Sequence, residues 1–254
     1  MTTSQKIALV TGGNRGLGRA DALHLAAAGV DIVITYRTSP ADAQTVVSAI
    51  TELGPAAVAL QLDTSDVSSF DGFAEHLRST LQEQWGRTTF DYLVNNAGIS
   101  LTAPFADTTE NEFDQLVNVH FKGVFFLTQT LLPLLADGGA IVNVSTGLTR
   151  FTVAGQAAYA AMKGAIEVLT RYQAAELGAR AIRVNAIAPG ATATDFSGGM
   201  VRDNEQVRAY LTSQVALGRV GEPDDVGAAV NALLSDDNRW MTAQRVEVSG
   251  GQSL

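Results

Sequence analysis

The chain has 254 residues, of which 46% are hydrophobic and 17% are charged, so it is long enough and apolar enough to bury a full core. Its formal net charge of -9 argues against nucleic acid and anionic membranes as partners. The lack of cysteine excludes disulfides and thiolate chemistry, and three scattered histidines predict no metal site.

The first apolar run, at residues 7–10, is too short for the hydrophobic region of a signal peptide. No apolar stretch reaches the length of a transmembrane helix. We therefore expect a cytoplasmic protein.

Short apolar runs alternate with longer segments of helical spacing along the whole chain. Strands are predicted at residues 7–10, 32–35, 58–62, 92–94, 141–144, 183–187 and 246–248. Helices are predicted at residues 20–28, 41–53, 67–83, 110–135, 159–177 and 224–234. This alternation predicts an α/β chain with a doubly wound Rossmann fold, in which a parallel sheet of about seven strands carries helices on both faces. We expect one domain spanning residues 1–254, with its ligand site at the carboxyl ends of the strands.

A glycine-rich loop, TGGNRGLG at residues 11–18, lies between the first predicted strand and a helix. Such a loop lets the backbone approach a phosphate closely and directs N–H groups at it from the positive end of the helix. A tight turn that binds nothing is the alternative interpretation.

The second predicted strand ends without the carboxylate that would bind the 2′-hydroxyl of NAD. Arg37 stands there instead, and Arg15 lies on the glycine loop. Two guanidinium groups can bind a 2′-phosphate through charge-assisted hydrogen bonds, so the sequence favours NADP(H) over NAD(H). Two solvated surface arginines are the alternative.

Several motifs occur in order along the chain: TGGNRGLG at residues 11–18, NNAG at 95–98, YAAMK at 159–163 and PG at 189–190. GRVGEPDD at 218–225 and VSGG at 248–251 follow. Together they resemble the short-chain dehydrogenase/reductase family over nearly the whole chain. The resemblance implies an NADP(H)-dependent oxidoreductase that moves a hydride between nicotinamide and a small carbonyl or alcohol substrate. It also implies a substrate lid at residues 193–214 and a homodimer or homotetramer.

The resemblance further implies which residues bind the cofactor. Those around the pyrophosphate and the adenosine ribose are Gly12, Asn14, Arg15, Gly16, Leu17 and Gly18. The adenine, the ribose and the carboxamide end would meet Asp63, Thr64, Asn96, Pro189, Gly190, Thr192 and Thr194. Asp63 can equally act at the start of a helix, and the two roles are compatible.

Tyr159 and Lys163 are four residues apart on a predicted helix, so their side chains share one face. A tyrosine hydroxyl can give a proton to a carbonyl oxygen that receives a hydride. Lowering the tyrosine pKa from about 10 to about 7 requires roughly 4 kcal/mol, which one ammonium about 4 Å away can supply. The spacing therefore predicts that Lys163 activates Tyr159 and binds the nicotinamide ribose. An aromatic packing residue beside a solvated lysine is the alternative.

Two further positions depart from the family pattern. Thirteen residues before Tyr159, where the resemblance places a substrate-orienting serine, stands Thr146, with Ser145 one residue earlier. The asparagine of the family's proton relay is replaced by His120, two residues after Asn118. We expect Thr146 to take the serine's role, and His120 to hold a relay water or to titrate near neutrality. A histidine on a helix face with no chemistry is the alternative.

Two other functions remain open. A non-catalytic NADP-binding module would use the dinucleotide for regulation. A 3-oxoacyl-carrier-protein reductase would need an acidic carrier, which the net charge disfavours unless a local patch around Arg171, Arg180 and Arg183 compensates.

Overall fold

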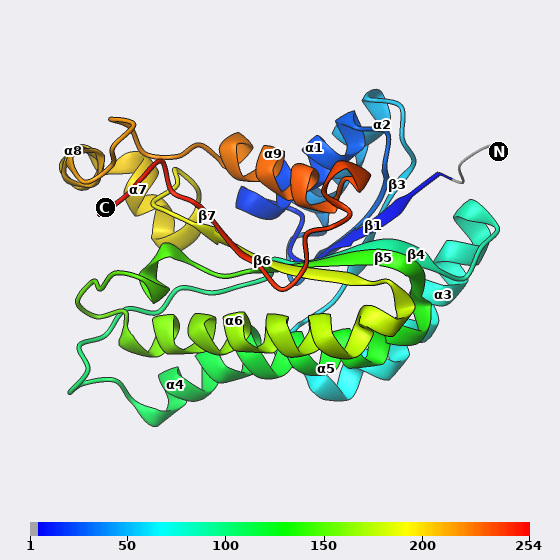
Figure 1. Cartoon of the computed structure of the whole chain (residues 1–254), viewed down its shortest axis with the longest axis horizontal. Helices are drawn as coiled ribbons and strands as arrows, with labels where there is room; N and C mark the ends of the chain where they lie inside the picture. The colour runs from blue at the N-terminus through cyan, green and yellow to red at the C-terminus, as the bar shows by residue number, and fades with distance from the viewer. Residues whose placement is uncertain (1–4) are drawn as a thin grey trace.

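The computed structural model describes residues 5–254 (Figure 1). Seven strands within this range form one parallel sheet in the order β3-β2-β1-β4-β5-β6-β7. The strands are β1 Ile7–Val10, β2 Asp31–Tyr36, β3 Ala57–Gln61, β4 Phe90–Asn95, β5 Leu135–Val144, β6 Arg183–Pro189 and β7 Arg245–Val248. The order reverses direction between β1 and β4, which creates the crevice in which doubly wound folds bind their ligands.

Nine α-helices of the described range connect these strands. They are α1 Gly16–Ala27, α2 Pro40–Glu52, α3 Phe70–Trp85, α4 Glu110–Val117, α5 Gly123–Leu131, α6 Ala157–Leu177, α7 Met200–Asp203, α8 Glu205–Ser213 and α9 Pro223–Leu234. Figure 1 shows α1, α2 and α9 on one face of the sheet and α4, α5 and α6 on the other. The predicted doubly wound fold with helices on both faces is confirmed.

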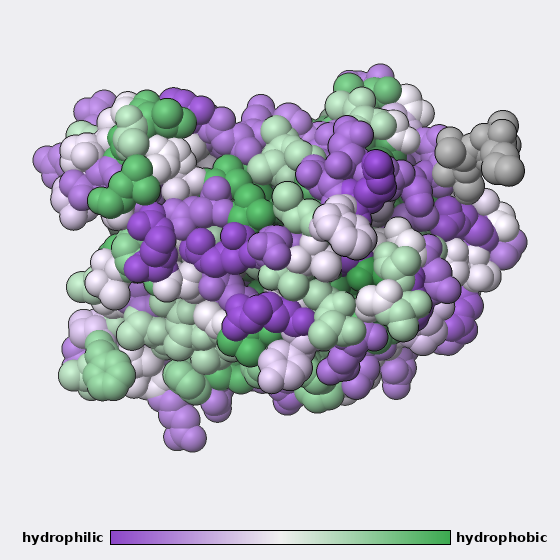
Figure 2. Space-filling model, in the orientation of Figure 1, coloured by the Kyte–Doolittle hydropathy of each residue, from purple (hydrophilic) through white to green (hydrophobic). Residues whose placement is uncertain are grey.

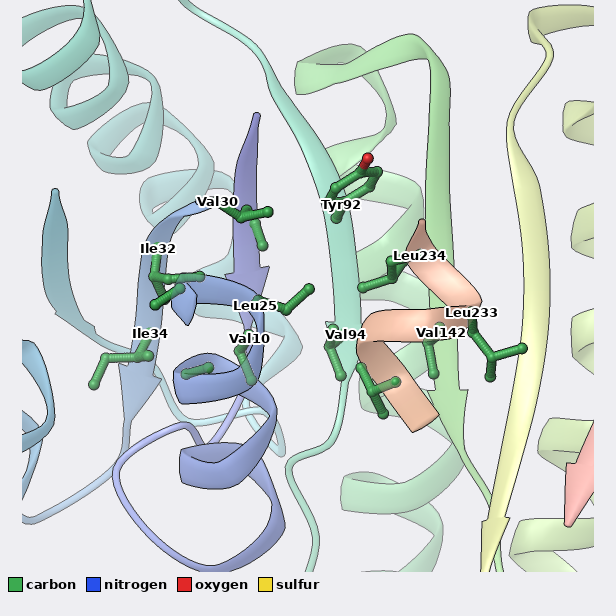
Figure 3. Packing of buried hydrophobic residues seen from close by; sticks show 14 of the residues in the cluster. Val10, Leu25, Val30, Ile32, Ile34, Tyr92, Val94, Val142, Leu233 and Leu234 are labelled. Atoms are coloured by element: carbon green, nitrogen blue, oxygen red, sulfur yellow. The ribbon is translucent and has the colours of Figure 1, made fainter. Parts of the chain in front are cut away.

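Alternate side chains of each strand build two separate cores. Ala8 and Val10 of β1 pack with residues of α1, α2 and α9, whereas Ile7 and Leu9 pack with residues of α3, α5 and α6. In Figure 3, aliphatic side chains of neighbouring strands meet Leu25 of α1 and the end of α9. Burial on both faces explains why the strands read as apolar runs without alternation.

The predicted helix at residues 110–135 is wrong in its detail. The π-helical segment Asn118–Lys122 separates α4 from α5, and the 3-10 helix Leu132–Leu134 ends the helical stretch. β5 begins already at Leu135 and pairs with Phe90. The tertiary pairing of β5 with β4 therefore overrides a continuous helical pattern.

The segment at residues 193–214 holds the 3-10 helix Phe196–Gly199, α7 and α8, and we call it the lid segment. Figure 1 places α7 and α8 beyond the carboxyl ends of the strands, near the C-terminus.

A hydrophilic band crosses the same view of the surface near β7 (Figure 2). Among residues 5–254, no helix combines the length and the apolar character needed to cross a bilayer.

Candidate active site

A cavity of about 420 Å³ lies across the carboxyl ends of the strands and beneath the lid segment. Residues from widely separated parts of the sequence border it, including both loops that carry the predicted cofactor and catalytic groups. The predicted site residues along its wall are Gly12, Asn14, Arg15, Gly16, Leu17, Arg37, Asp63, Thr64, Asn96, His120, Ser145, Thr146, Tyr159, Lys163, Pro189, Gly190, Thr192 and Thr194. The fold thus brings them into one site.

The glycine loop runs along one end of the cavity and leads into α1. Gly12 and Gly16 have φ values of 63° and 55°, in the left-handed region that a side chain disfavours. Arg15, at the N-cap of α1, makes no side-chain capping hydrogen bond, so N–H groups of the first turn can serve an anion. The local geometry is that of an anion-binding helix start.

Gly18 differs from the other loop residues because it does not border the cavity. A Cβ atom at this position would lie 2.4 Å from Asn96 Nδ2 and 2.5 Å from the Gly12 carbonyl oxygen. Asn96 Nδ2 itself donates to the Thr11 carbonyl oxygen at 2.8 Å. The predicted cofactor contact of Gly18 is therefore indirect: it lets α1 pack closely on the glycine loop.

Arg37, directly after β2, borders this end of the cavity. Arg15, on the glycine loop, borders it as well. Asp63 lies nearby and accepts hydrogen bonds from the backbone N–H and the hydroxyl of Ser65 at 2.9 and 2.7 Å. Although partial burial opposes ionisation, these bonds and the charge of Arg37 hold the pKa of Asp63 below its usual value. The end of the cavity therefore presents guanidinium groups and one ionised carboxylate.

Tyr159, in the first turn of α6, lies beside Thr146, which follows β5 and whose side chain partly offsets the burial that raises the tyrosine pKa. The neighbouring Ser145 directs its hydroxyl away, because it donates to Glu167 Oε1 at 2.6 Å. Successive residues of an extended segment point to opposite sides, which separates these two hydroxyls. The structure thus places Thr146, rather than Ser145, beside the tyrosine.

Lys163 lies one turn further along α6 and is only 4% exposed. Its Nζ donates to the Val144 carbonyl oxygen at 2.6 Å and lies 5.8 Å from the centre of the Tyr159 ring. Burial lowers the pKa of Lys163 to about 7 and raises the pKa of Tyr159 above its ordinary value. The prediction that Lys163 brings the tyrosine pKa toward neutrality is wrong for this structure, because burial raises the pKa of Tyr159 and disfavours the charged form of Lys163.

His120 packs edge to face against Tyr159, with the ring centres 5.1 Å apart. Its Nε2 lies 2.8 Å from the Ile99 carbonyl oxygen and 3.2 Å from the Ile99 backbone nitrogen, so the tautomer decides whether Nε2 donates to the carbonyl or accepts from the N–H. Nδ1 is buried and has no hydrogen-bond partner within residues 5–254. Burial first, and then the charge of Lys163, lower the pKa of His120 to about 3, so the predicted titration near neutrality is wrong.

The π-helical segment Asn118–Lys122 is the local reason for this placement of His120. Gly123, directly after it, approaches the loop after β3 so closely that a Cβ atom would lie 2.0 Å from the Thr64 carbonyl oxygen. Such single π turns often occur at functional sites. The bulge directs the imidazole inward instead of along a regular helix face.

Comparison with known proteins identifies the family. The profile of the Enoyl-(Acyl carrier protein) reductase family matches residues 12–253. The chain belongs to the short-chain dehydrogenase/reductase family. It is therefore an oxidoreductase of carbonyl and alcohol groups, and the resemblance read from its motifs is confirmed.

Two curated relatives cover nearly the whole of this short-chain dehydrogenase/reductase. Elsinochrome reductase 1 of Elsinoe fawcettii is 35% identical, with 98% of this chain and 95% of the relative aligned. The 3-oxoacyl-[acyl-carrier-protein] reductase FabG of Staphylococcus aureus is 34% identical, with 98% of each protein aligned.

Two solved structures of reductases are also similar to this chain in fold and in sequence. The promiscuous reductase LugOII, which catalyses keto-reduction at C1 during lugdunomycin biosynthesis, has a TM-score of 0.93 and 36% identity over 98% of each chain. The angucycline C-6 ketoreductase LanV with bound NADP has a TM-score of 0.92 and 36% identity, covering 98% of this chain and 95% of its own.

Sequence reasoning missed a polar cluster behind the catalytic residues of this short-chain dehydrogenase/reductase. Glu167 Oε1 accepts hydrogen bonds from Ser145, Thr149 and Arg245 at 2.6 to 2.7 Å. Arg245, at the start of β7, also donates to the Thr146 carbonyl oxygen at 3.2 Å. The position of Glu167, one helical turn after Lys163, was the only signal in the sequence, and its partner lies 78 residues away.

Proposed function

We propose that the chain is an NADP(H)-dependent reductase in which Tyr159 donates a proton to the oxygen of a free small-molecule ketone. The grouping of Thr146, Tyr159 and buried Lys163 on one wall of the cavity is the observation that carries the proposal. A pKa held above the ordinary tyrosine value keeps the hydroxyl protonated at neutral pH, so it is available as a donor. Thr146 orients the substrate oxygen, and Ser145 supports the loop from behind.

The residues at the other end of the cavity fit an NADP molecule. The glycine loop offers uncapped N–H groups for the pyrophosphate, and Arg15 and Arg37 suit a 2′-phosphate. No carboxylate ends β2, which argues against the ribose contact that NAD requires. When bound, the reduced nicotinamide supplies a hydride to the carbonyl carbon. The ketoreductase LanV, with NADP bound, supports this assignment.

The other predicted contacts are part of the same proposal. Asp63 and Thr64 would border the adenine, and Asn96 the ribose. Thr192 and Thr194, after the loop that begins at Pro189, would border the carboxamide. Lys163, with its pKa lowered to about 7, can return a proton to the Tyr159 oxygen after each turnover.

The cofactor choice is tested by the ratio of kcat/KM for NADPH and NADH. Replacing Arg37 with Asp should reduce this ratio at least about tenfold, because one guanidinium–phosphate contact contributes roughly 1.5–3 kcal/mol. Arg239, exposed beyond α9, offers a control of equal charge change, and Arg239→Asp should leave the ratio unaltered. An equal loss in both variants would show only a long-range charge effect.

The proton donor is tested by Tyr159→Phe. This variant should bind NADPH normally, as followed by cofactor fluorescence, yet lose at least about 10²-fold in kcat. NADPH consumption by the wild-type protein also separates an enzyme from a non-catalytic NADP-binding module, the other class of function. A phenylalanine variant within tenfold of wild type would remove Tyr159 from the proton transfer.

A 3-oxoacyl-carrier-protein reductase is the second candidate, favoured by the family profile and by the similarity to FabG. Two of the three arginines predicted to support it, Arg180 and Arg183, are engaged within the protein. Arg180 bonds to Asp137 and to the carbonyl oxygens of Leu132 and Leu135. Arg183 donates to three carbonyl oxygens at the end of α9. With those guanidinium groups occupied, the net charge of -9 disfavours an acidic carrier.

We also propose that the chain acts as one domain with residues 193–214 as its lid, and that it forms a homodimer or homotetramer. Apolar side chains exposed on α5 and α6 support assembly: Phe125, Phe126, Val168 and Tyr172. Light scattering after size exclusion would give the subunit number. Location in the cytoplasm stays a prediction.

A further inference from the structure

Apolar side chains line the part of the cavity that extends away from Tyr159. The residues that form this wall are Ile99, Leu148, Phe151, Val153, Phe196, Val201 and Leu211. Two of them, Val153 and Phe196, are 50% and 42% exposed although they border the cavity. An apolar rim that is open to solvent fits a ligand whose apolar body extends past the pocket.

Phe196 brings an aromatic ring to the proton donor. Its ring centre lies 6.0 Å from that of Tyr159, with the ring planes inclined by 51°. The backbone N–H of Phe196 donates to Thr194 Oγ1 at 3.2 Å, and the next residue, Ser197, shares a 2.7 Å hydrogen bond with Ser100 across the cavity mouth. These bonds fix the lid segment on either side of Phe196, whose ring lies beside that of Tyr159.

Phe151 brings a second ring to the same wall. It packs so closely over Gly147 that a Cβ atom there would lie 2.9 Å from the Phe151 ring. The Arg150 guanidinium lies 5.3 Å from the centre of this ring on a loop that begins next to Thr146. Two rings therefore stand at the substrate end of the cavity, where flat aromatic ligands gain stacking or edge contacts.

No arginine of the described range is among the residues that border this end of the cavity, and the arginines of residues 202–219 are paired with carboxylates. Arg202 bonds to Asp195 and Asp203, Arg208 to Glu222, and Arg219 to Asp225. Arg150, next to Phe151, is paired with Glu247. Salt-paired guanidinium groups offer little to a phosphate or an acidic protein, so a neutral ligand fits best here.

From this arrangement we infer that the substrate is a neutral, planar, fused-ring ketone with at least one aromatic ring, free in solution. The inference rests on the proposed reductase function and names its substrate class. The carbonyl oxygen lies at Tyr159 and Thr146, while the ring system lies along Phe151 and Phe196. Ring hydroxyls are accommodated by Ser197 and Gln156, two polar residues that border the cavity.

Three ketones test the inference with the full chain and NADPH: two share a bicyclic skeleton and differ in aromaticity, and the third is acyclic. 2-Tetralone carries a fused aromatic ring, 2-decalone has the same skeleton without aromaticity, and the N-acetylcysteamine thioester of 3-oxobutanoic acid represents an acyl chain. The value of kcat/KM for 2-tetralone should exceed both others at least tenfold. Equal or higher values for the thioester overturn the inference while leaving the reductase function intact.

Phe196→Leu separates an aromatic contact from simple apolar volume. Since an aromatic pair adds a modest free energy beyond burial, the preference for 2-tetralone over 2-decalone should fall about two- to tenfold in this variant. Phe105→Leu is the matched control, because Phe105 is 86% exposed and does not border the cavity. An unchanged preference in Phe196→Leu overturns the role given to this ring.

Calorimetric titration with 2-naphthol, which has the flat rings but no ketone, reports the ligand class without turnover. Binding in the presence of NADPH, weakened two- to tenfold by Phe196→Leu and not by Phe105→Leu, supports the inference even if none of the three ketones is reduced. Such a result would reject the reductase function alone. Failure of 2-naphthol to bind the wild-type protein overturns the inference.

Discussion

Replacing Glu167 with Ala tests whether the polar cluster behind the cavity positions the catalytic loop. One oxygen of Glu167 accepts hydrogen bonds from Ser145, Thr149 and Arg245, and Arg245 continues to the Thr146 carbonyl oxygen. The Glu167 and Arg245 side chains are only 15% and 24% exposed, so their charges are largely shielded from water. Removing the carboxylate takes one shared acceptor from three donors, of which Thr149 and Arg245 keep other acceptors.

Removing one partner of a fully buried ion pair costs about 3–5 kcal/mol. Because the pair keeps some exposure, we expect Glu167→Ala to lower the free energy of unfolding by about 2–3 kcal/mol. For a chain of this size that corresponds to a fall in Tm of roughly 5–10 °C. Glu167→Gln retains an acceptor for the hydroxyls and should lose about half as much. Calorimetry measures both, and Glu176→Ala, exposed on the same helix, is the control.

Positioning is distinguished from plain stability by a double-mutant cycle on kcat below the melting range. If Glu167 acts on turnover through Thr146, then adding Glu167→Ala to Thr146→Ala should lower kcat little further. Fully additive losses would show that the two residues act independently. An unchanged kcat in Glu167→Ala alone would refute the positioning role while leaving the stability prediction standing.

Three further predictions follow from buried groups and close contacts. Asp21 is fully buried, and its carboxyl has no hydrogen-bond partner in the described range. Burial raises the pKa of Asp21 well above the usual value, so the folded state retains a proton that the unfolded state loses. Stability should therefore decrease as pH rises above about 4, and Asp21→Asn should be more stable in urea by about 1–3 kcal/mol at pH 8, with a smaller difference at pH 5. An inflection of kcat near pH 7 should persist in His120→Asn, because the pKa of Lys163 is about 7 and that of His120 is about 3. If the inflection disappears from the pH profile of this variant, the histidine is the titrating group. Gly18→Ala should weaken NADPH binding at least tenfold by displacing the glycine loop. In Gly164→Ala the added Cβ atom meets nothing within 4 Å, so this variant should raise Tm slightly. Equal effects of the two variants in fluorescence titrations and melting curves would contradict this prediction.

The sequence by itself determined the layers of the fold and the residues around the cavity. Apolar runs such as 7–10 without alternation predicted a sheet covered on both faces, since each face must be buried by helices. Glycine motifs and the i, i+4 spacing of Tyr159 and Lys163 are local signals, because a helix start and a helix face are set by neighbouring residues. The 13-residue interval to Thr146 likewise indicated the hydroxyl that lies at the tyrosine.

Only the tertiary structure decided the electrostatics of the site. The pKa values of Tyr159, Lys163 and His120 are governed by burial, which depends on how α6 and the π-helical segment pack together and not on sequence spacing. The pairing of Glu167 with Arg245 joins α6 to an edge strand 78 residues later in the chain. A long-range contact leaves no periodic trace in the sequence, because it forms only after the sheet has brought its strands together.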